Sequence, residues 1–586
     1  MIRMQKPIIS LQKRSWKPIS YRQHVADQLA MRYQLDGVSA RILSSRLHAI
    51  EDAPRFLEPS LRNDLPDPSG LADMDKAASI AASAIEKRHA IAIWGDYDVD
   101  GTSSTALLLR LFHGLGTSPE LYIPDRFREG YGPNNQGFAQ LIEHGVSLVI
   151  MADCGTSAHD VLQSARARGV ETIVLDHHVV DHDLPPANAI VNPKRDDDAS
   201  GLDQLAAVGI SFMFAVALVR TLRLRGFFTP SCPEPDLRMV LDLVALGTVC
   251  DVVPLTGINR TFVTQGLKIM NRRANSGLAR LCTKAGLVRD ATSEDLAFAI
   301  GPRINAGARI GEADLAARLL AGLEPLREEG FATDLDAYNQ QRKQFEQDCL
   351  QAALGKLDAS DSWLVWAASD DWHPGVIGIV ASRLRERYDR PALVFHCDGE
   401  LATGSGRSFS GIDLGQAVLS AKKQGLLLAG GGHAMAAGFT VQQHKIKAFC
   451  AYLVGHFKQQ CQGVMPAAVS QIDAVLPVRA LTGELRDGFS RLEPFGAGNH
   501  EPKLMLNDAT ITRVRWIKDQ HIACLLGDRQ ASGHIRAIAF RAGGQAWGDV
   551  LSNPPATGLY LYGRLSRDNW QGREDVQFMI EDVALP

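Results

Sequence analysis

One short stretch, IAIWGDYDVDG from Ile91 to Gly101, places strong limits on how this chain can fold. It joins an apolar run typical of a buried strand to three carboxylates at alternate positions, Asp96, Asp98 and Asp100, and a helix-like segment follows. Alternate residues on extended backbone point to the same side, so the spacing predicts negative charge concentrated at the end of one strand. Carboxylates packed together repel one another unless they take up protons or bind divalent cations. A solvated acidic turn is the alternative, whereas an EF-hand loop fits poorly because Glu is missing from its twelfth position.

Strand-like and helix-like segments alternate around this stretch. A helix is expected from residue 73 to about 88, and apolar strands are expected at 91–95, near 121, at 148–152 and at 172–175, with helices between them. This alternation predicts an α/β domain with a parallel sheet and helices on both faces. Ligands of such sheets bind beyond the carboxyl ends of the strands.

Further metal-binding side chains follow later strands of the same predicted sheet. Asp153 comes directly after one strand in ADCGTS, and Asp176, His177 and His178 follow the next in LDHHVVDH. Asp251 stands in the apolar segment LGTVCDVVPL, where an unpaired carboxylate would be costly. Each motif alone has a simpler interpretation, a loop histidine pair or a structural aspartate. The groups after three strands, Asp96, Asp153 and Asp176 to His178, coincide at corresponding strand ends, and this favours a site of oxygen and imidazole ligands that suits manganese or magnesium.

Glycine-rich segments with polar residues predict phosphate contacts. Arginine side chains can bind a phosphate bidentately, and glycines let the backbone approach it closely. The residues concerned are Arg303, Asn305 and Arg309 in GPRINAGARIG, Ser405 and Arg407 in ATGSGRSFSG, and His433 in AGGGHAMAAGF. Each segment is interpreted here as a loop; for the first, a helix start with surface arginines is the alternative.

Length and local composition suggest several domains. We expect an N-terminal extension (1–72), a first α/β domain (73–325), a long linking helix (326–357), a second, smaller α/β domain (358–464) and a β-barrel of the OB type (465–586). In the last region, short alternating β segments contain basic and aromatic residues suited to nucleic acid, Arg513, Arg515, Trp516 and Lys518.

Charge and cysteine content limit the cellular setting. The net charge of −4 gives no overall basic signal, so a nucleic-acid site must be a local groove. Nine cysteines without a CxxC pair suit a reducing cytoplasm. The basic start of the chain lacks the apolar core of a signal peptide, and the run Met213–Val219 is too short to span a bilayer. We therefore expect a cytoplasmic protein without membrane contact.

The motifs and their order resemble one family. GDYDVDG, PDR with GYG (Asp125 to Gly132), ADCGTS, DHH, LGTVCDVVPL, GPRINAGAR, WHPGVIGIVASRL, GSGRS and GGGHAMAAG occur in the order found in the RecJ family of the DHH phosphoesterase superfamily. The resemblance covers about Ile91 to Phe439, and the β-rich C-terminal region fits the OB-fold of the family. One departure is visible: the usual NAAGR is NAGAR here, which leaves the role of Arg309 open.

The resemblance implies a 5′ to 3′ exonuclease that degrades single-stranded DNA to mononucleotides in recombination and repair, with two Mn²⁺ or Mg²⁺ ions. It also implies a monomer whose partners are single-stranded DNA, a single-strand-binding protein and a recombination or repair helicase. Two alternatives remain: a DHH phosphodiesterase for short oligonucleotides or cyclic dinucleotides, and a non-catalytic DHH scaffold in a replication assembly. The first usually lacks the barrel, and the second typically loses metal ligands.

Roles can be assigned as hypotheses. We expect Asp153 to bridge two metals, with Asp96 and Asp98 toward one and Asp100, His177 and Asp251 toward the other. His178 is expected to contact the phosphate and Asp176 to orient the imidazoles, so the expected catalytic residues are His178, Asp176 and Asp153. The second α/β domain is expected to close a cleft too narrow for a duplex. The expected substrate-binding residues are Arg126, Arg303, Asn305, Arg309, His373, Ser405, Arg407 and His433.

Overall fold

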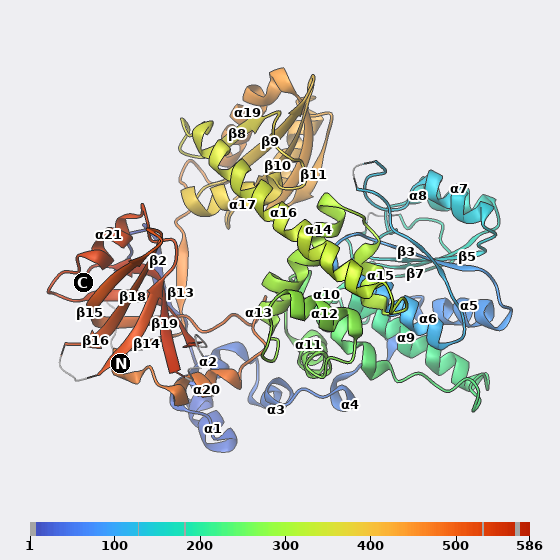
Figure 1. Ribbon diagram of the computed structural model, residues 1–586, viewed down its shortest axis with the longest axis horizontal. Coiled ribbons are helices and arrows are strands. Elements are labelled where there is room, and N and C mark those ends of the chain that lie inside the picture. Colours follow the sequence, from blue (N-terminus) through green and yellow to red (C-terminus); the bar gives the residue numbers. More distant parts are fainter. Residues whose placement is uncertain (1–7, 127, 181–182, 530–532, 569–574) are drawn as a thin grey trace. The chain divides into compact units, whose positions relative to one another are not determined.

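The computed structural model describes residues 8–126, 128–180, 183–529, 533–568 and 575–586 (Figure 1). The chain divides into two compact units. One consists of Glu51–Gln341 together with Leu492–His500, and the other contains the rest of the chain. Each is described separately below.

The first unit is built on a five-stranded parallel sheet with strand order β4-β3-β5-β6-β7. Its strands are β3 (Ile91–Gly95), β4 (Glu120–Tyr122), β5 (Leu148–Ala152), β6 (Glu171–Leu175) and β7 (Ala189–Val191). The parallel α/β sheet expected from the alternating segments is confirmed. Because the strands are parallel, their carboxyl ends lie at one edge of the sheet, and the residues after β3, β5 and β6 come together there.

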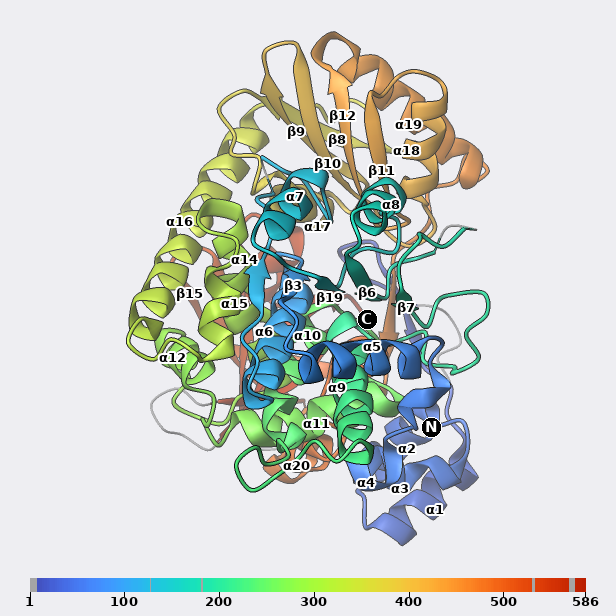
Figure 2. The same cartoon turned by 90° about the vertical axis from the view of Figure 1, so that its right-hand side faces the viewer.

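Helices cover both faces of this sheet (Figure 2). Ile93, Ile150 and Ile173 point into a core with α5 (Met74–Glu86), α6 (Val99–Gly114) and α9 (Ala207–Leu224). On the opposite face, Trp94 and Met151 pack with α7 (Asn135–Glu143) and α8 (His159–Ala167). Successive strand residues thus enter opposite cores, which explains why the strands are apolar throughout.

A helical layer completes the first unit. It contains α3 (Ala53–Leu57), α4 (Leu61–Asp64), α10 (Leu241–Cys250), α11 (Gly257–Met270), α12 (Ser276–Lys284), α13 (Ser293–Asp295), a π-helical turn (Leu296–Ile300), α14 (Gly301–Ile310) and α15 (Leu315–Ala321). Helix α9 is long and apolar enough to cross a membrane by length and composition. Its side chains are largely buried against α5, α6 and α10, so here it is a core helix of the domain.

The segment GPRINAGARIG is helical rather than a loop, which corrects the expectation from sequence. Residues 301–310 form α14, with Pro302 in the first turn, where its missing N–H costs no helical hydrogen bond. Gly311, just after the helix, leaves room for the ring of Tyr338, since a Cβ there would lie 2.2 Å from that ring. The glycines thus serve helix packing and termination.

The second unit contains another α/β domain, with strand order β11-β12-β10-β9-β8. Its strands are β8 (Val365–Ser369), β9 (Ala392–Asp398), β10 (Leu401–Arg407), β11 (Ala429–His433) and β12 (Ala436–Gln442). Helix α17 (Ile377–Tyr388) packs on one face, and α18 (Leu414–Lys423) and α19 (Ile446–Gln460) pack on the other. The long helix α16 (Glu328–Gly355) precedes this domain, as expected.

Both glycine-rich segments of this domain are strands, again in contrast to the predicted loops. Gly404 lies in β10, and a Cβ at this position would lie 2.0 Å from the ring of Phe439. Gly406 is crowded in the same way by Leu393, 2.7 Å from such a Cβ. Glycine is therefore required in the strand because large side chains of the core cross directly over its backbone.

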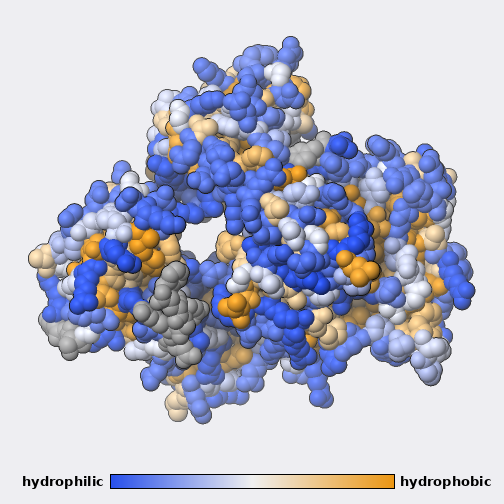
Figure 3. All heavy atoms as spheres, in the orientation of Figure 1, coloured by the Kyte–Doolittle hydropathy of each residue, from blue (hydrophilic) through white to orange (hydrophobic). Residues whose placement is uncertain are grey.

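The C-terminal region forms a closed barrel of β15, β16, β17, β19 and β18, with β18 pairing back to β15. These strands are β15 (Leu504–Ile517), β16 (His521–Asp528), β17 (His534–Ala539), β18 (Leu559–Asp568) and β19 (Asp575–Ala584), and α21 (Ala546–Ser552) lies between β17 and β18 in the sequence. The predicted OB-type barrel is confirmed. Hydrophobic surface gathers over the barrel strands in Figure 3.

The remaining helices and strands of the second unit precede this barrel in the sequence. They are β1 (Ile8–Ile9), β2 (Ser15–Pro18), α1 (Gln23–Tyr33), α2 (Gly37–Arg46), β13 (Val469–Ile472), β14 (Ala474–Leu476) and α20 (Gly483–Ser490). Strands β1, β2 and β13 form a small sheet of their own. A strand near the N-terminus therefore pairs with a strand that shortly precedes the barrel, within the second unit.

Candidate metal centre

The acidic motif after β3 is only partly extended. Asp98 is the N-cap of α6, and its Oδ1 accepts a hydrogen bond from the Gly101 backbone N–H at 3.0 Å. Asp100 already belongs to the first turn of α6. The expectation of three carboxylates on extended backbone is therefore wrong for Asp100. Gly101 is needed because a Cβ there would lie 2.5 Å from the Asp96 Cβ, so the helix can begin directly against the strand end.

Asp153 follows β5 directly and lies at the centre of the cluster. Its side chain is buried, and its backbone adopts a left-handed conformation with φ of +64°. A non-glycine residue in this region is strained, and such strain is concentrated at functional sites. The Asp153 N–H donates to the Leu175 carbonyl at 2.9 Å, which ties the ends of β5 and β6 together.

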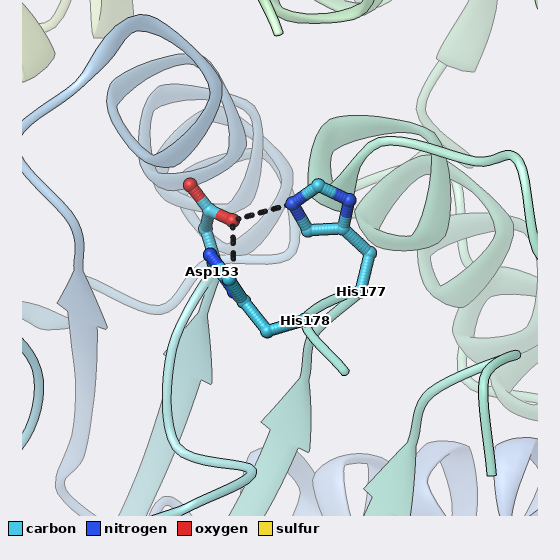
Figure 4. A group of neighbouring side chains, drawn as sticks. All are labelled: Asp153, His177 and His178. Carbon is cyan, nitrogen blue, oxygen red and sulfur yellow. Dashed lines mark ion pairs between the residues drawn. The ribbon is translucent and has the colours of Figure 1, made fainter. Parts of the chain in front are cut away.

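The DHH motif after β6 brings two imidazoles to Asp153 (Figure 4). His177 Nε2 is 3.2 Å from Asp153 Oδ1, and His178 Nδ1 is 3.9 Å from the same oxygen. The other nitrogen of His177, Nδ1, is 3.6 Å from Asp251 Oδ2 at the end of α10. His177 Nε2 also lies 3.9 Å from Asp100 Oδ2. His177 is therefore surrounded by three carboxylates from three different elements.

Asp176 contacts the backbone and one imidazole of the DHH motif. Its Oδ1 accepts hydrogen bonds from the backbone N–H groups of His177 and His178, at 2.7 and 3.1 Å, and lies 2.7 Å from His178 Nδ1. Its Oδ2 accepts from the backbone N–H and the hydroxyl of Thr156, at 3.0 and 2.6 Å. These contacts support the orienting role that the sequence predicts for Asp176.

Burial and mutual repulsion raise the carboxylate pKa values. Burial, and then the charge of Asp98, raise the pKa of Asp96, and burial together with Asp100 raises that of Asp153 well above its ordinary value. Burial and Asp251 raise the pKa of Asp100 to about 7, and burial and Asp98 raise that of Asp251 to about 7. These acids carry unfavourable charge at neutral pH unless cations compensate it.

The two histidines differ electrostatically. Burial lowers the pKa of His177 and favours the neutral imidazole, the form that binds metals. Burial also opposes charge on His178, but its hydrogen bond to Asp176 and the charge of that carboxylate raise the pKa of His178. For Asp176 itself, burial is outweighed by His178 and Thr156, so its pKa is lowered. The pair Asp176–His178 therefore favours an ionised carboxylate beside a protonated imidazole.

The donor set fits divalent cations. Two buried atoms, Asp153 Oδ1 and His177 Nδ1, lack a hydrogen-bond partner among the described residues. Potential ligand atoms lie within 4.8 Å of one another in three overlapping groups: Asp96, Asp98 and Asp153; Asp100, His177 and Asp251; and Asp153, His177 and His178. Asp153 and His177 each belong to two groups. This arrangement of carboxylate oxygens and imidazole nitrogens suits Mn²⁺ or Mg²⁺ at two neighbouring positions.

Comparison with known proteins agrees with this geometry. Residues 90–248 match the DHH family N-terminal domain, residues 360–459 match the DHHA1 domain, and residues 472–582 match the RecJ OB domain. The chain is 33% identical over 547 residues to the single-stranded-DNA-specific exonuclease RecJ of Dickeya dadantii, covering 90% of this chain and 93% of the relative. The chain belongs to the RecJ family.

Other RecJ proteins support the same placement. The RecJ of Bacillus subtilis is 32% identical over 94% of this chain and 68% of the relative. The crystal structure of Thermus thermophilus RecJ in complex with Mn²⁺ superposes with a TM-score of 0.79, at 27% identity over 97% of this chain and 79% of the other. A structure of the same protein with Mg²⁺ gives a TM-score of 0.74, at 26% identity, over 97% and 78% of the two chains.

Two supporting residues escaped the sequence analysis of this RecJ-family site. Asn192 follows β7 and is fully buried; its Nδ2 donates to Thr156 Oγ1 at 3.1 Å and to the His178 carbonyl at 2.9 Å. Thr156 in turn donates to Asp176. A signal for Asn192 was available, because it is a polar residue directly after a strand of the same sheet.

The residues expected to bind substrate in the first unit have different surroundings. The guanidinium of Arg126 lies 5.3 Å from the centroid of the Tyr97 ring. Asn305 and Arg309 are partly exposed and four residues apart on α14, so they share a helix face. Arg303 instead pairs with Asp336 at 2.8 Å and donates to the Ala299 carbonyl at 2.7 Å.

In the DHHA1 domain, strand pairing aligns the remaining candidates. Arg407 and His433 both pair with Ala436, from opposite sides of β12, so the two side chains point to the same face of the sheet. Arg407 Nη1 donates to Ser405 Oγ at 3.0 Å. A Cβ at Gly378 would lie within 3.1 Å of both Ser405 and Arg407, so the first turn of α17 abuts them.

His373 lies in the loop before α17. Its ring stacks on Phe345 with 5.2 Å between ring centroids, and its Nδ1 accepts a hydrogen bond from the Gly375 N–H at 3.0 Å. Burial, with a contribution from the charge of His396, lowers its pKa. These contacts favour a neutral imidazole at the entry to α17.

Proposed function

We propose that this protein is a metal-dependent exonuclease that degrades single-stranded DNA from the 5′ end to mononucleotides in recombination and repair. The convergence of five aspartates and one histidine from β3, α6, β5, β6 and α10 carries the proposal. The exonuclease activity named for its RecJ relatives supports it. The RecJ OB domain and the retained acidic and imidazole groups speak against the short-oligonucleotide phosphodiesterase and the non-catalytic scaffold.

The metal ligands divide into two sets around Asp153. Asp96, Asp98 and Asp153 would hold one cation, and Asp100, His177 and Asp251 the other, with Asp153 shared between them. When bound, a pair of divalent cations supplies the Lewis-acid chemistry that phosphodiester hydrolysis requires. Asp100 is also held by the N-terminus of α9, because its two oxygens accept from the backbone N–H groups of Ala207 and Val208 at 2.7 and 2.9 Å. These bonds hold the Asp100 carboxylate in place.

In this proposal, His178 is the cationic side chain that stabilises the reacting phosphate. The raised pKa of its imidazole, supported by Asp176, favours a cationic donor beside the cluster. A positioned cationic donor stabilises the negative charge that develops on phosphoryl oxygens in the transition state. Thr156 and Asn192 fix Asp176 and the His178 backbone, so this donor requires little reorganisation during the reaction.

Ser405 and Arg407 are proposed to bind the 5′-terminal phosphate. The hydroxyl, the guanidinium and the first turn of α17 supply donors of the kind that bind phosphate. His433 on the same sheet face, with Arg126, Asn305, Arg309 and His373, is proposed to contact further parts of the strand. We assign Arg303 to the support of α14, because Asp336 and backbone carbonyls occupy its guanidinium.

Cellular context follows from the same proposal. We infer a cytoplasmic monomer that acts with a single-strand-binding protein and a repair or recombination helicase. The domain limits expected from the sequence, 73–325, 326–357, 358–464 and 465–586 after an extension of 72 residues, are retained as part of this proposal.

Digestion of single-stranded DNA labelled at either end tests this function. With Mn²⁺, the 5′-labelled strand should release labelled mononucleotide at the earliest times, whereas the 3′-labelled strand should shorten progressively. EDTA should abolish both reactions, and a blunt duplex should resist digestion. Early release of the 3′ label, or equal cutting of the duplex, would contradict the proposed polarity or strand specificity.

A further inference from the structure

A tyrosine outside the predicted site reaches the centre of the metal cluster. Tyr131 lies between β4 and α7, and its hydroxyl is 3.2 Å from the backbone carbonyl oxygen of Asp153, to which it donates. The same hydroxyl is 3.3 Å from Nε2 and 3.4 Å from Nδ1 of His178. One side chain therefore contacts both the shared metal ligand and the histidine assigned to the phosphate.

The segment that carries Tyr131 is built to hold this position. The carboxylate of Glu129 accepts three hydrogen bonds: from the Tyr122 hydroxyl at 2.7 Å, the Asp125 N–H at 2.9 Å and Asn134 Nδ2 at 2.9 Å. These donors tie the segment to β4 on one side and to the start of α7 on the other. Tyr131 itself is flanked by Gly130 and Gly132, which both have positive φ angles, +86° and +79°. The backbone turns on either side of Tyr131, so that its side chain can reach Asp153.

Asp153 needs a partner at its carbonyl. Its φ of +64° costs conformational energy, and such a backbone persists only where surrounding contacts hold it. The N–H of Asp153 is held by Leu175, and the Tyr131 hydroxyl holds its carbonyl. Both peptide groups of the strained residue are thus restrained, which fixes the direction of the Asp153 carboxylate.

The ring of Tyr131 faces outward at the same time. About half of the residue is exposed (52%), and its ring meets Tyr97 edge-on with 6.4 Å between centroids. Arg126 extends this series, with its guanidinium 5.3 Å from the centroid of Tyr97. Two aromatic rings and a guanidinium beside a phosphate-processing site are the groups on which single-stranded nucleic acids stack.

We propose that Tyr131 is a positioning residue of the nuclease reaction and a contact of the reacting nucleotide. Its hydroxyl holds the Asp153 backbone and the His178 ring, and its exposed ring packs against the sugar or base next to the scissile phosphate. Entry of a nucleotide is in this way coupled to the geometry of the catalytic groups. The inference rests on the proposed exonuclease function and adds a residue to it.

Two substitutions separate the roles of the hydroxyl and the ring. Tyr131→Phe should lower kcat by about 10-fold or more and leave KM within about two-fold, because only the positioning bonds are lost. Tyr131→Ala should also raise KM by about 5-fold or more, because a stacking surface is removed. Tyr452→Phe is the control, since it removes a tyrosine hydroxyl that lies 2.8 Å from Ser420 Oγ in the DHHA1 domain, and it should retain most of the wild-type kcat.

A second measurement does not depend on activity. In protein without metal, hydrogen–deuterium exchange of the peptide from Asp153 to Thr156 should be faster in Tyr131→Phe than in wild type, and unchanged in Tyr452→Phe. Unchanged exchange and kcat in Tyr131→Phe would overturn the inference, as would equal effects of both substitutions. An inactive wild-type protein with the predicted exchange difference would instead overturn the exonuclease proposal and leave the positioning role supported.

Discussion

At the scale of single residues, the metal centre concentrates unfavourable charge. Asp153 shows this clearly: burial and the neighbouring carboxylates Asp100, Asp98 and Asp96 all raise its pKa. Its position near those groups is useful only when cations are bound, because in their absence the charges repel one another. Function and stability of the metal-free protein therefore make opposite demands on this side chain.

Asp153→Asn tests that opposition. We expect kcat to fall by more than about a thousand-fold, because several kcal/mol of transition-state stabilisation by the cations are lost. The melting temperature in EDTA should stay equal to that of wild type or rise, because one buried charge is removed. Nuclease assays and calorimetry measure the two effects, and substantial remaining activity would contradict the shared-ligand role.

The substitution Asn192→Ala tests whether the hydrogen bonds of Asn192 orient the DHH motif. Loss of its bonds to Thr156 and the His178 carbonyl should reduce kcat by about 10–100-fold, the usual range for residues that orient metal-site groups. Asn188→Ala is a suitable control, since Asn188 precedes the same strand and accepts a hydrogen bond from the Thr172 N–H. Comparable losses in both variants would indicate damage to β7 rather than to the site.

Asp242 is a buried carboxylate outside the metal centre, and we expect it to make the free energy of unfolding depend on pH. Burial raises its pKa to about 6 from an ordinary value of 3.8. The folded state therefore binds this proton more tightly than the unfolded state, and the destabilisation by Asp242 is full above pH 6 and is lost as the pH falls toward 4. Asp242→Asn should raise the free energy of unfolding at pH 8 by up to about 3 kcal/mol, and by much less at pH 4.

Urea unfolding of the wild type and of Asp242→Asn at both pH values measures this difference. Asp236→Asn serves as the comparison: the hydrogen bond from Arg238 lowers the Asp236 pKa, so this substitution should not stabilise the protein at pH 8. A gain for Asp242→Asn that is equal at pH 4 and pH 8 would contradict the titration argument.

At the scale of elements, glycines in the DHHA1 sheet show how packing overrides a local pattern. Gly404 and Gly438 lie on adjacent strands, but a Cβ at Gly404 would overlap Phe439, whereas a Cβ at Gly438 would meet nothing within 4 Å. Gly404→Ala should cost about 1–3 kcal/mol of unfolding free energy, and Gly438→Ala should be nearly neutral. Chemical denaturation of both variants measures the contrast, and similar losses would argue against this account.

The same glycines explain what the sequence could and could not predict. The apolar strands before Asp96, Asp153 and Asp176 are continuous and short, so their type and order were predictable. The glycine-rich segments were predicted as loops because local sequence does not reveal that Phe439 and Leu393 cross over them. Helix α14 was missed for a related reason, since its glycines make room for residues distant in the chain.

The candidate site was predictable to a similar extent. Side chains directly after strands of one parallel sheet must meet at one edge, so the sequence alone brought Asp96, Asp153 and His177 together. The contacts of Tyr131 depend on a segment folded back by Glu129 and two glycines, and no periodic pattern marks such a segment. The sequence predicts Arg303 as a phosphate ligand, and it does not reveal that Arg303 forms an ion pair with Asp336, 33 residues later.

At the scale of the whole molecule, the proposed separation of phosphate binding from metal binding predicts how a 5′-phosphate on the DNA strand affects the reaction rate. Ser405 and Arg407 belong to the DHHA1 domain, whereas the metal ligands belong to the unit that is built on the parallel sheet. Arg407→Ala should reduce the preference for a 5′-phosphorylated over a 5′-hydroxyl strand and leave Mn²⁺ binding unchanged. Rates on the two strands measure this preference, and a preference equal to that of wild type would count against the assignment.

The central claim is that carboxylates and an imidazole from five separate elements hold two neighbouring cations in one cavity. Electron paramagnetic resonance of the protein titrated with Mn²⁺ tests it most directly. We predict two bound ions per chain whose spectrum shows the spin coupling of ions about 3.5–4 Å apart, and loss of the coupled signal in Asp153→Asn. A single bound ion, or two ions without coupling, would contradict the account.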